Sequence, residues 1–260
     1  MKLDGKVAIV TGAGSIGEGI GIGKAISITL AREGAKVALV DKSQERADET
    51  LRLIKDDGGD AVVLPIDLTQ PSSAQQIVDE TVARYGGVDI LVNNAAAARS
   101  IGILETPVEL YEEMVAVNVT APFALCKAAI PIMIERGGGA IVNISSISAL
   151  RGQGGANTAY ATTKASMLGL TIDLADAFGT NGIRVNCIAP GIINTPQRAA
   201  VIRAGGHDPA DFDLSQKTSL GIEGDAWDVA RAVLFLAGPD GRYVTGVLLP
   251  VDGGVTARSH

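Results

Sequence analysis

The segment YATTK places Tyr160 four residues before Lys164, and none of the other tyrosines has a lysine at that distance. Residues four apart lie on the same face of an α-helix, so the two side chains are expected to project together. A free phenol has a pKa of about 10, and a neighbouring cation favours its ionised form. The pair is therefore suited to exchanging a proton near neutral pH. The alternative is a chance pair on a helix surface, which the apolar continuation ASMLGL argues against.

A glycine-rich stretch, TGAGSIGEGIGIGKA, begins at Thr11, directly after the apolar run KVAIV. Its glycines fit two spacings: G-x-G-x-x-G at Gly12, Gly14 and Gly17, or G-x-x-x-G-x-G at Gly17, Gly21 and Gly23. A helix that began at Gly17 would carry several glycines in its first turns, each costing up to about 1 kcal/mol relative to alanine. We therefore predict a tight turn at Gly12 and a helix that begins at Gly21–Gly23, whose free N–H groups can bind a pyrophosphate. The alternative is a flexible loop without a ligand.

Asp41 ends the second predicted strand, 18 residues after Gly23. A carboxylate at this position can accept hydrogen bonds from the ribose hydroxyls of a bound dinucleotide, and it repels a 2′-phosphate. The sequence thus predicts NAD rather than NADP as the cofactor. The alternative role of Asp41, capping the next helix, is one that Ser43 already offers.

Short β-branched runs alternate with helical patterns along the chain. We predict strands at 6–11, 36–41, 61–67, 89–94, 139–146, 183–190 and 246–254. We predict helices near 23–33, 43–57, 71–85, 107–135, 158–179 and 225–237. This alternation implies βαβ units and a doubly wound parallel sheet of about seven strands with helices on both faces.

No linker or repeat divides residues 1–260, so we expect a single α/β domain. Ligands of such sheets bind outside the carboxyl ends of the strands. That rule predicts functional residues near 11–23, 41, 67, 93–96, 145–148 and 190–196.

Composition narrows the class of protein. The formal net charge is −7, which argues against nucleic acid or an anionic membrane surface as a partner. Cys126 and Cys187 have no metal-ligand or disulfide-framework spacing, so we expect reduced thiols and no metal site. The N-terminus enters a strand pattern without a long apolar segment, and we expect a soluble, cytoplasmic protein.

The motifs taken together resemble the short-chain dehydrogenase/reductase family. They are Thr11-Gly12 with Gly21 and Gly23, NNAA at 93–96, Asn118 in VNV, NISS at 143–146, YATTK, and PGIINTP at 190–196. The resemblance extends over essentially the whole chain, through YVTGVLLPVDGG. It implies a single-domain Rossmann fold and a hydride transfer between NAD(H) and a secondary alcohol or ketone. It also implies a homo-oligomer, a tetramer in this family.

The resemblance assigns four catalytic residues. Tyr160 would be the general acid/base, and Lys164 would lower its pKa and hold the nicotinamide ribose. Ser146 would hydrogen-bond the substrate oxygen as charge develops. Asn118 would hold a water that relays protons from Lys164. An alternative for Asn118 is a buried polar residue at a helix kink, and both roles can hold together.

The resemblance also implies a set of cofactor contacts. Asp67 and Leu68 would line the adenine, Asn93 and Ala95 the ribose side, and Ile193 and Thr195 the carboxamide. The full expected set is Gly12, Ser15, Ile16, Gly21, Ile22, Gly23, Asp41, Asp67, Leu68, Asn93, Ala95, Tyr160, Lys164, Pro190, Gly191, Ile193 and Thr195.

Three features depart from the family pattern. The glycine loop is five residues longer than usual, which leaves open which of Ser15, Ile16 and Ile22 contacts phosphate. Ala96 stands where the family usually has glycine. Ser146 precedes Tyr160 by 14 positions instead of 13, so Ser148 is an alternative to Ser146 as the catalytic serine.

Two other functions are alternatives to this one. A 3-oxoacyl-[acyl-carrier-protein] reductase takes an acidic partner and usually NADPH, and neither suits an acidic chain with Asp41. A non-catalytic NAD-binding sensor would be favoured by the loss of Ser146, Tyr160 or Lys164, and all three are present.

The sequence does not specify the substrate. A lid is expected at 192–224, and the expected lining residues are Ala97, Ser148, Gln153 and Ile192.

Overall fold

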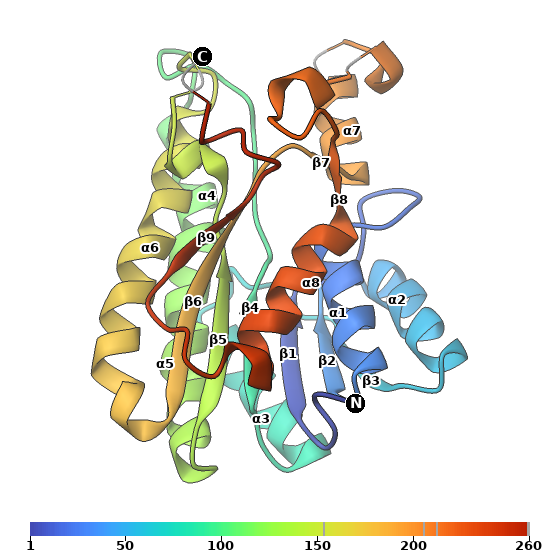
Figure 1. The fold of residues 1–260 in the computed structure, drawn as a ribbon, viewed down its shortest axis with the longest axis vertical. Coiled ribbons are helices and arrows are strands. Elements are labelled where there is room, and N and C mark those ends of the chain that lie inside the picture. The colour runs from blue at the N-terminus through green and yellow to red at the C-terminus, as the bar shows by residue number, and fades with distance from the viewer. Residues whose placement is uncertain (153, 205, 212, 259–260) are drawn as a thin grey trace.

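The computed structural model describes residues 1–260 except 153, 205, 212 and 259–260 (Figure 1). It contains a seven-stranded parallel sheet in the order β3-β2-β1-β4-β5-β6-β9. The strands are β1 (Val7–Thr11), β2 (Lys36–Val40), β3 (Asp60–Leu64), β4 (Ile90–Asn93), β5 (Gly139–Ile144), β6 (Ile183–Pro190) and β9 (Leu248–Val251). The strand order reverses between β1 and β4, as in a doubly wound sheet.

Helices cover both faces of this sheet. The α-helices of the described residues are α1 (Ile22–Arg32), α2 (Gln44–Asp56), α3 (Ser73–Tyr85), α4 (Val108–Val115), α5 (Ala121–Glu135), α6 (Thr158–Phe178), α8 (Ala226–Ala237) and, beyond the end of the sheet, α7 (Pro196–Ala204). One hydrophobic core lies between the sheet and α1, α2 and α8. A second lies between the opposite face and α3, α5 and α6. The predicted fold class is therefore confirmed.

The strands show why the core forms on both sides. In β1, Ala8 and Val10 belong to the first core and Ile9 to the second. Side chains alternate across a strand, so a strand buried on both faces must be apolar throughout. This accounts for the unbroken apolar runs from which the strands were predicted.

Two helices, α2 and α8, begin with a side-chain cap. The side chain of Ser43 accepts a hydrogen bond from the Arg46 N–H at the start of α2. Asp225 and Asp228 form a reciprocal capping box at the start of α8. These short-range bonds satisfy helix N–H groups that have no intrahelical partner.

Two regions differ from the predicted elements. The predicted helix 107–135 is α4 and α5 joined by a π-helical turn, Ala116–Thr120. The segment after β6 forms a short ladder of β7 (Ile193–Asn194) with β8 (Gly224–Asp225), and helix α7 follows β7. Neither β7 nor α7 has a clear periodic pattern in the sequence, because a two-residue strand and a nine-residue helix contain too few residues to show one.

By length and composition, the stretch Val108–Glu135 could cross a membrane, with a mean hydropathy of 1.6 over its most apolar window. In this fold, Leu125, Ala129 and Met133 of α5 are buried in the second core. Core helices of soluble proteins pass the same test, so the stretch is weak evidence for a span.

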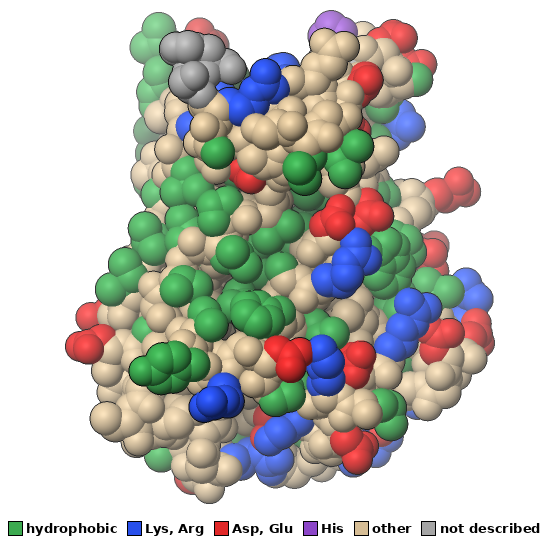
Figure 2. Space-filling model, in the orientation of Figure 1, with side chains coloured by type: hydrophobic (Ala, Val, Ile, Leu, Met, Phe, Trp, Pro, Cys, Tyr) green, Lys and Arg blue, Asp and Glu red, His purple; other side chains and the backbone are tan. Residues whose placement is uncertain are grey.

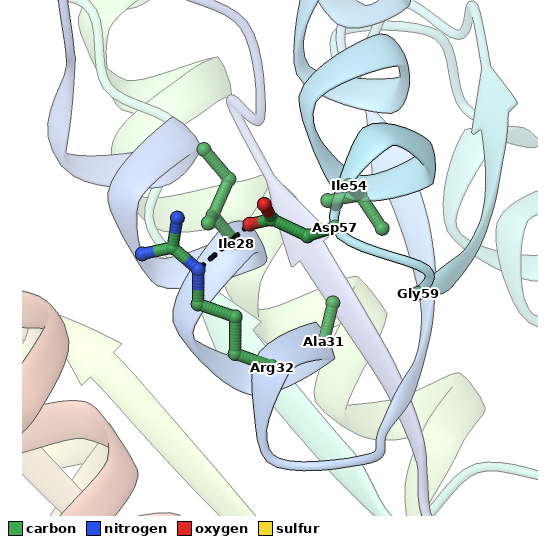
Figure 3. Close-up of a pocket in the computed structure, with 6 residues that line it drawn as sticks. All are labelled: Ile28, Ala31, Arg32, Ile54, Asp57 and Gly59. Carbon is green, nitrogen blue, oxygen red and sulfur yellow. Dashed lines mark hydrogen bonds and ion pairs between the residues drawn. The ribbon is translucent and has the colours of Figure 1, made fainter.

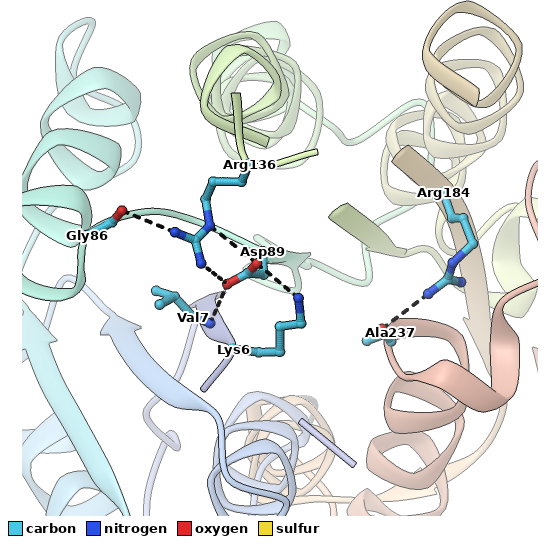
Figure 4. Close-up of polar contacts among 7 residues, drawn as sticks. All are labelled: Lys6, Val7, Gly86, Asp89, Arg136, Arg184 and Ala237. Atoms are coloured by element: carbon cyan, nitrogen blue, oxygen red, sulfur yellow. Dashed lines mark hydrogen bonds and ion pairs between the residues drawn. The ribbon is translucent and has the colours of Figure 1, made fainter. Parts of the chain in front are cut away.

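At the amino end of the strands, two arginines tie elements together (Figure 4). Asp89 accepts a hydrogen bond from the Val7 N–H at 2.9 Å and ion pairs from Arg136 and Lys6 at 3.1 and 3.3 Å. Arg184 of β6 donates to carbonyl oxygens at the C-terminal end of α8 and after it, including those of Ala237 and Gly241. Both clusters lie away from the carboxyl edge where the functional residues were predicted.

Candidate active site

The glycine loop adopts the second of the two possible registers. Helix α1 begins at Ile22, with Gly21 as an extended N-cap residue. Gly12 has φ +64°, and a Cβ on Gly23 would lie 1.9 Å from the Gly12 carbonyl oxygen. No side chain fits between the turn and the helix, so the two glycines let the turn pack directly against the start of α1.

Ser15 is joined to the helix start. Its Oγ accepts a hydrogen bond from the Gly21 N–H at 2.7 Å, which uses one of the free donors of the α1 N-terminus. The Ser15 hydroxyl hydrogen remains available to donate. Ile16 is largely exposed, whereas Ile22 packs against the first core.

Asp41 follows β2, and its carboxylate bridges two segments. One oxygen accepts from the Gly14 N–H at 3.1 Å and the other from the Ser43 N–H at 3.0 Å. The helix-start role considered for Asp41 is therefore present in the structure, alongside the Ser43 cap. Each carboxylate oxygen can accept a further hydrogen bond, and the side chain is only partly buried, so a ribose contact is still open to it.

Lys164 is buried beneath Tyr160 on α6. Its Nζ lies 6.0 Å from the centre of the Tyr160 ring and donates to the Ile144 carbonyl oxygen at 2.7 Å. Burial lowers the pKa of Lys164 to about 8. Burial raises the pKa of Tyr160 to about 12, against the opposing effect of a hydrogen bond with Ser146.

These pKa values do not match the expectation that Lys164 brings the phenol towards neutrality. In this structure burial is the larger effect on Tyr160, because an enclosed phenolate loses its hydration. The side chains do project together as the spacing predicts.

Ser146 lies between Tyr160 and Ser148. Its Oγ accepts from the Ser148 N–H at 3.1 Å and donates to the Ser148 Oγ at 3.1 Å. It thereby begins a short 3-10 turn, Ile147–Ala149. Ser146 lowers the pKa of Tyr160 through hydrogen bonding, which agrees with Ser146 as the serine beside the reacting oxygen.

Asn118 lies in the π-helical turn, and its side chain is fully engaged. Its Oδ1 accepts from the Ala97 N–H at 2.8 Å, and its Nδ2 donates to the Ala97 carbonyl at 2.8 Å and to Thr163 Oγ1 at 2.9 Å. Asn118 is therefore a buried polar residue at the π-helical turn, as the alternative role proposed. Its hydrogen bonds hold the segment after β4 against α6. Thr163 carried no sequence signal of its own for this contact.

The two asparagines of NNAA have different surroundings. Asn93 is 2% exposed, and its Nδ2 donates to Asn143 Oδ1 at 2.8 Å. Its side chain is thus buried and bonded to β5, although Asn93 itself is the last residue of β4. Asn94, which sequence reasoning did not single out, donates to the carbonyls of Thr11 and Gly12 and so holds the glycine turn.

The other expected cofactor residues follow strand ends as predicted. Asp67 and Leu68 lie after β3, where Thr69 hydrogen-bonds Asp67 and lowers its pKa. Pro190 ends β6, and a Cβ on Gly191 would meet Asp252 at 2.5 Å. Ile193 is buried in β7, and Ala95 donates its N–H to Thr11 Oγ1. The Thr195 Oγ1 accepts from the Arg198 N–H at the start of α7.

Among the expected substrate residues, Ala97 and Ile192 lie on the segments that follow β4 and β6. Gln153 lies outside the described residues. A hollow of about 400 Å³ is lined by Ser148, by residues 149–152, 155 and 157, and by residues 158, 161 and 162 of α6. Of the candidate catalytic residues, Tyr160 and Lys164 do not line this hollow. A crevice between α1 and α2, crossed by the Arg32–Asp57 ion pair, holds about 10 Å³ (Figure 3). That is room for at most one water molecule.

The expected lid contains an ion pair between Arg198 and Glu223 at 2.8 Å. Glu223 also accepts from the Leu214 N–H, so it joins α7 to the segment before β8. Burial raises the pKa of Glu223, but the bonds from Arg198 and Leu214 outweigh it and the net pKa is lowered. Arg151 donates to the Val255 carbonyl.

Comparison with known proteins supports the resemblance to the short-chain dehydrogenase/reductase family. A family model described as enoyl-(acyl-carrier-protein) reductase matches residues 17–256. An uncharacterized oxidoreductase of Thermotoga maritima is 40% identical, over 99% of this chain and 100% of that protein. A 2,5-dichloro-2,5-cyclohexadiene-1,4-diol dehydrogenase of Sphingobium indicum is 40% identical, over 97% of each. A 3-oxoacyl-[acyl-carrier-protein] reductase of Thermotoga maritima is 34% identical, over 98% and 99%.

Solved structures agree. A putative short-chain dehydrogenase/reductase from Burkholderia xenovorans has a TM-score of 0.94 at 39% identity, with 100% and 99% of the two chains covered. A 7α-hydroxysteroid dehydrogenase complexed with NADH and 7-oxoglycochenodeoxycholic acid scores 0.88 at 35%, covering 97% and 95%. A putative 2-deoxy-D-gluconate 3-dehydrogenase from Agrobacterium tumefaciens with bound NADP scores 0.86 at 35%, covering 99% and 98%.

These findings confirm the predicted oxidoreductase function, acting on CH–OH groups with a nicotinamide cofactor. Whether that cofactor is NAD or NADP is not decided by them, since similar proteins bind each. By sequence and by fold, the chain belongs to the short-chain dehydrogenase/reductase family.

Proposed function

We propose that this protein interconverts a secondary alcohol and a ketone with NAD(H), and that Tyr160 exchanges the proton with the substrate oxygen. The observation that carries the proposal is the grouping of Tyr160 with Lys164 beneath its ring and Ser146 hydrogen-bonded to it. Ser146 orients the substrate oxygen, and Lys164 places a positive charge where it favours the phenolate.

The glycine loop and α1 fit a dinucleotide. A Cβ on Gly12 would lie 2.9 Å from Ala95 Cα, and one on Gly23 would overlap the Gly12 carbonyl. This close approach of three segments brings their backbones to one place beside the α1 N-terminus, where an anion is stabilised. When bound, NAD supplies the nicotinamide ring that accepts or gives the hydride.

The preference for NAD rests on Asp41. Its carboxylate stands after β2 with one side open, and a negative charge there disfavours the 2′-phosphate of NADP. Measuring kcat/KM with NAD and with NADP tests this point. Equal or better use of NADP by the unaltered protein would refute the role of Asp41.

The substrate is proposed to be a ring alcohol with an apolar body. Ala97, Ile147 and Ile192 are apolar residues on the segments that follow β4, β5 and β6, and similar proteins are described as acting on a cyclohexadiene diol and a hydroxysteroid. A panel of cyclic and open-chain secondary alcohols, assayed with NAD by absorbance of NADH, tests the function. Tyr160→Phe should remove the activity, and a variant that retained it would overturn the proposed chemistry.

The 3-oxoacyl-[acyl-carrier-protein] reductase function remains the second candidate, because a reductase of that description is 34% identical. It predicts efficient reduction of 3-oxoacyl thioesters with NADPH. The same assay panel, extended by such a thioester, separates the two functions.

We also propose a homo-oligomer. The large apolar side chains Phe123, Ile134 and Ile172 are exposed on α5 and α6. A second apolar area lies over β9, β6 and α8 (Figure 2), where Phe235 and Val247 are exposed. Apolar patches and unpaired edge strands of this kind favour covering by further copies, and two such faces fit a tetramer. Light scattering after size-exclusion chromatography measures the assembly, and Val247→Glu should reduce its size.

We propose a cytoplasmic location because both cysteines are free thiols. Cys126 and Cys187 are buried free thiols, and burial raises their pKa to about 12 and about 11. Reduced cysteines are usual in reducing compartments. Cell fractionation tests this proposal.

A further inference from the structure

Lys24 is a buried charge that the proposed chemistry does not use. It stands in the first turn of α1, and its side chain is 0% exposed. Its Nζ lies 2.8 Å from Glu49 Oε1 of α2 and donates to the Gly19 carbonyl oxygen at 3.2 Å. A buried ammonium group is costly unless it is paired and hydrogen-bonded. The pairing therefore holds three segments together: α1, α2 and the glycine loop.

Gly19 belongs to the part of the loop that exceeds the usual family length. This part is 16–20, and removing it would leave TGAGSGIGKA, which has the common spacing. Ile20 at its end packs against the first core. The residues 16–20 are thus fixed at one end by an apolar contact and near their tip by Lys24.

The tip of the loop meets the lid helix. A Cβ on Gly19 would lie 3.2 Å from Pro196 Cγ, and Pro196 is the first residue of α7. Figure 1 shows the loop after β1 extending outwards beside β8 and below α7. The loop and the segment 190–196 are the two sides expected to hold the dinucleotide, so their contact closes the space between them.

We propose that residues 16–20 form a cover over the pyrophosphate part of the cofactor site, and that Lys24 is the positioning residue that holds this cover against α7. The cover slows the release of the dinucleotide. This inference rests on the proposed function, because it needs a nicotinamide dinucleotide in the site.

Deletion of 16–20 tests the cover directly. The dissociation rate of NADH, followed by stopped-flow fluorescence, should rise about tenfold, with a much smaller change in the association rate. An unchanged dissociation rate in a folded deletion variant would overturn the proposal.

Point variants test the anchor without shortening the loop. Lys24→Met removes the charge, and Glu49, which is 45% exposed, can then be solvated by water. The variant should release NADH about as fast as the deletion variant, and Lys24→Arg should restore slow release. The control Arg52→Met breaks the exposed Arg52–Asp56 ion pair on α2 and should leave release unchanged. A structural role alone would lower the unfolding temperature without changing release, and that result would refute the anchor.

Two glycines of the loop form a matched pair. Gly17 and Gly19 both have positive φ, +83° and +111°, but only a Cβ on Gly19 meets Pro196. Gly19→Ala should speed NADH release more than Gly17→Ala does. Equal effects would show that the contact with α7 plays no part.

The outcomes separate this inference from the proposed function. A wild-type protein that bound neither NADH nor NADPH would overturn both. A wild-type protein that bound NADH, with the same release rate in the deletion and Lys24→Met variants, would overturn the cover alone.

Discussion

Single side chains at the catalytic centre meet opposing electrostatic effects. Burial raises the pKa of Tyr160 to about 12, and it lowers that of Lys164 to about 8. Between pH 6 and 7 the phenol is therefore protonated and the ammonium is charged. This combination suits the donation of a proton to a ketone, with a positive charge nearby to stabilise the phenolate that remains.

Ketone reduction is accordingly expected to depend on the charge of Lys164. Because its pKa is lowered, the side chain is charged below about pH 8 and neutral above it. The rate at saturating NADH should be level from pH 6 to 7 and fall as the pH rises through about 8. Lys164→Ala should lower the rate and abolish this inflection. A pH–rate profile with the same inflection in the variant would exclude Lys164 as its source.

A second prediction concerns which of Ser146 and Ser148 donates a hydrogen bond to the substrate oxygen. Ser146→Ala should lower kcat by roughly 10²–10³, the usual cost of losing one donor to a developing oxyanion. Ser148→Ala removes a partner of Ser146 and should alter KM more than kcat. Steady-state kinetics of both variants at saturating NAD decide the matter, and a larger kcat loss at Ser148 would reverse the assignment.

At the scale of elements, the π-helical turn between α4 and α5 brings Asn118 to the segment after β4. Three hydrogen bonds of one side chain hold the Ala97 backbone and Thr163. An extra residue in a helical turn rotates the side chains that follow it, and such turns often occur at functional sites. Through Asn118, the π-helical turn thus positions the Ala97 segment of the candidate site, although Tyr160 itself lies on a different helix, α6.

Replacing this side chain should loosen that wall. Asn118→Ala leaves the Ala97 N–H and carbonyl without their partners and should destabilise the fold by about 1–3 kcal/mol. KM for the alcohol should rise as well. Thr163→Val, which removes only one of the three bonds, is the control and should have a smaller effect. Urea unfolding with steady-state kinetics measures both, and equal effects would mean that the Ala97 contacts contribute nothing.

For the whole molecule, stability and function lie at opposite ends of the sheet. The predicted functional residues gather at the carboxyl ends of the strands, whereas Asp89, Arg136 and Lys6 join elements at the amino ends (Figure 4). Burial raises the pKa of Asp89, but hydrogen bonds from Val7 and Arg136 and the two positive charges outweigh it, so the net pKa is lowered. Its stabilising effect is then present above the unfolded pKa of about 3.9 and is lost as the pH falls through the lower folded value.

Asp89→Asn is therefore expected to reduce the free energy of unfolding at pH 7 by about 2 kcal/mol, the range for hydrogen bonds to charged groups. The difference from wild type should shrink as the pH falls through the lowered folded pKa of Asp89, where the native carboxylate also gains its proton. NADH affinity should be unaffected, because the cluster is remote from the carboxyl edge. A loss of stability that did not vary with pH would contradict the electrostatic explanation.

Local pattern in the sequence was enough to predict the alternation of strands and helices, the doubly wound sheet and the strand ends that carry functional residues. It also predicted the helix start at Gly21–Gly23, because the cost of glycine within a helix is a local property. The spacing of Tyr160 and Lys164 predicted a shared helix face for the same reason.

Tertiary structure decided what depends on residues far apart in the chain. The raised pKa of Tyr160 follows from its burial. The side chain of Asn118 hydrogen-bonds the Ala97 backbone. Lys24 contacts Glu49 and Gly19 only once α1 and α2 pack together. The short elements of the lid have no periodicity long enough to predict, and their contacts place them. Spacing along a chain specifies the periodic conformation of neighbouring residues, whereas desolvation and charge pairing depend on distances that only the folded chain defines.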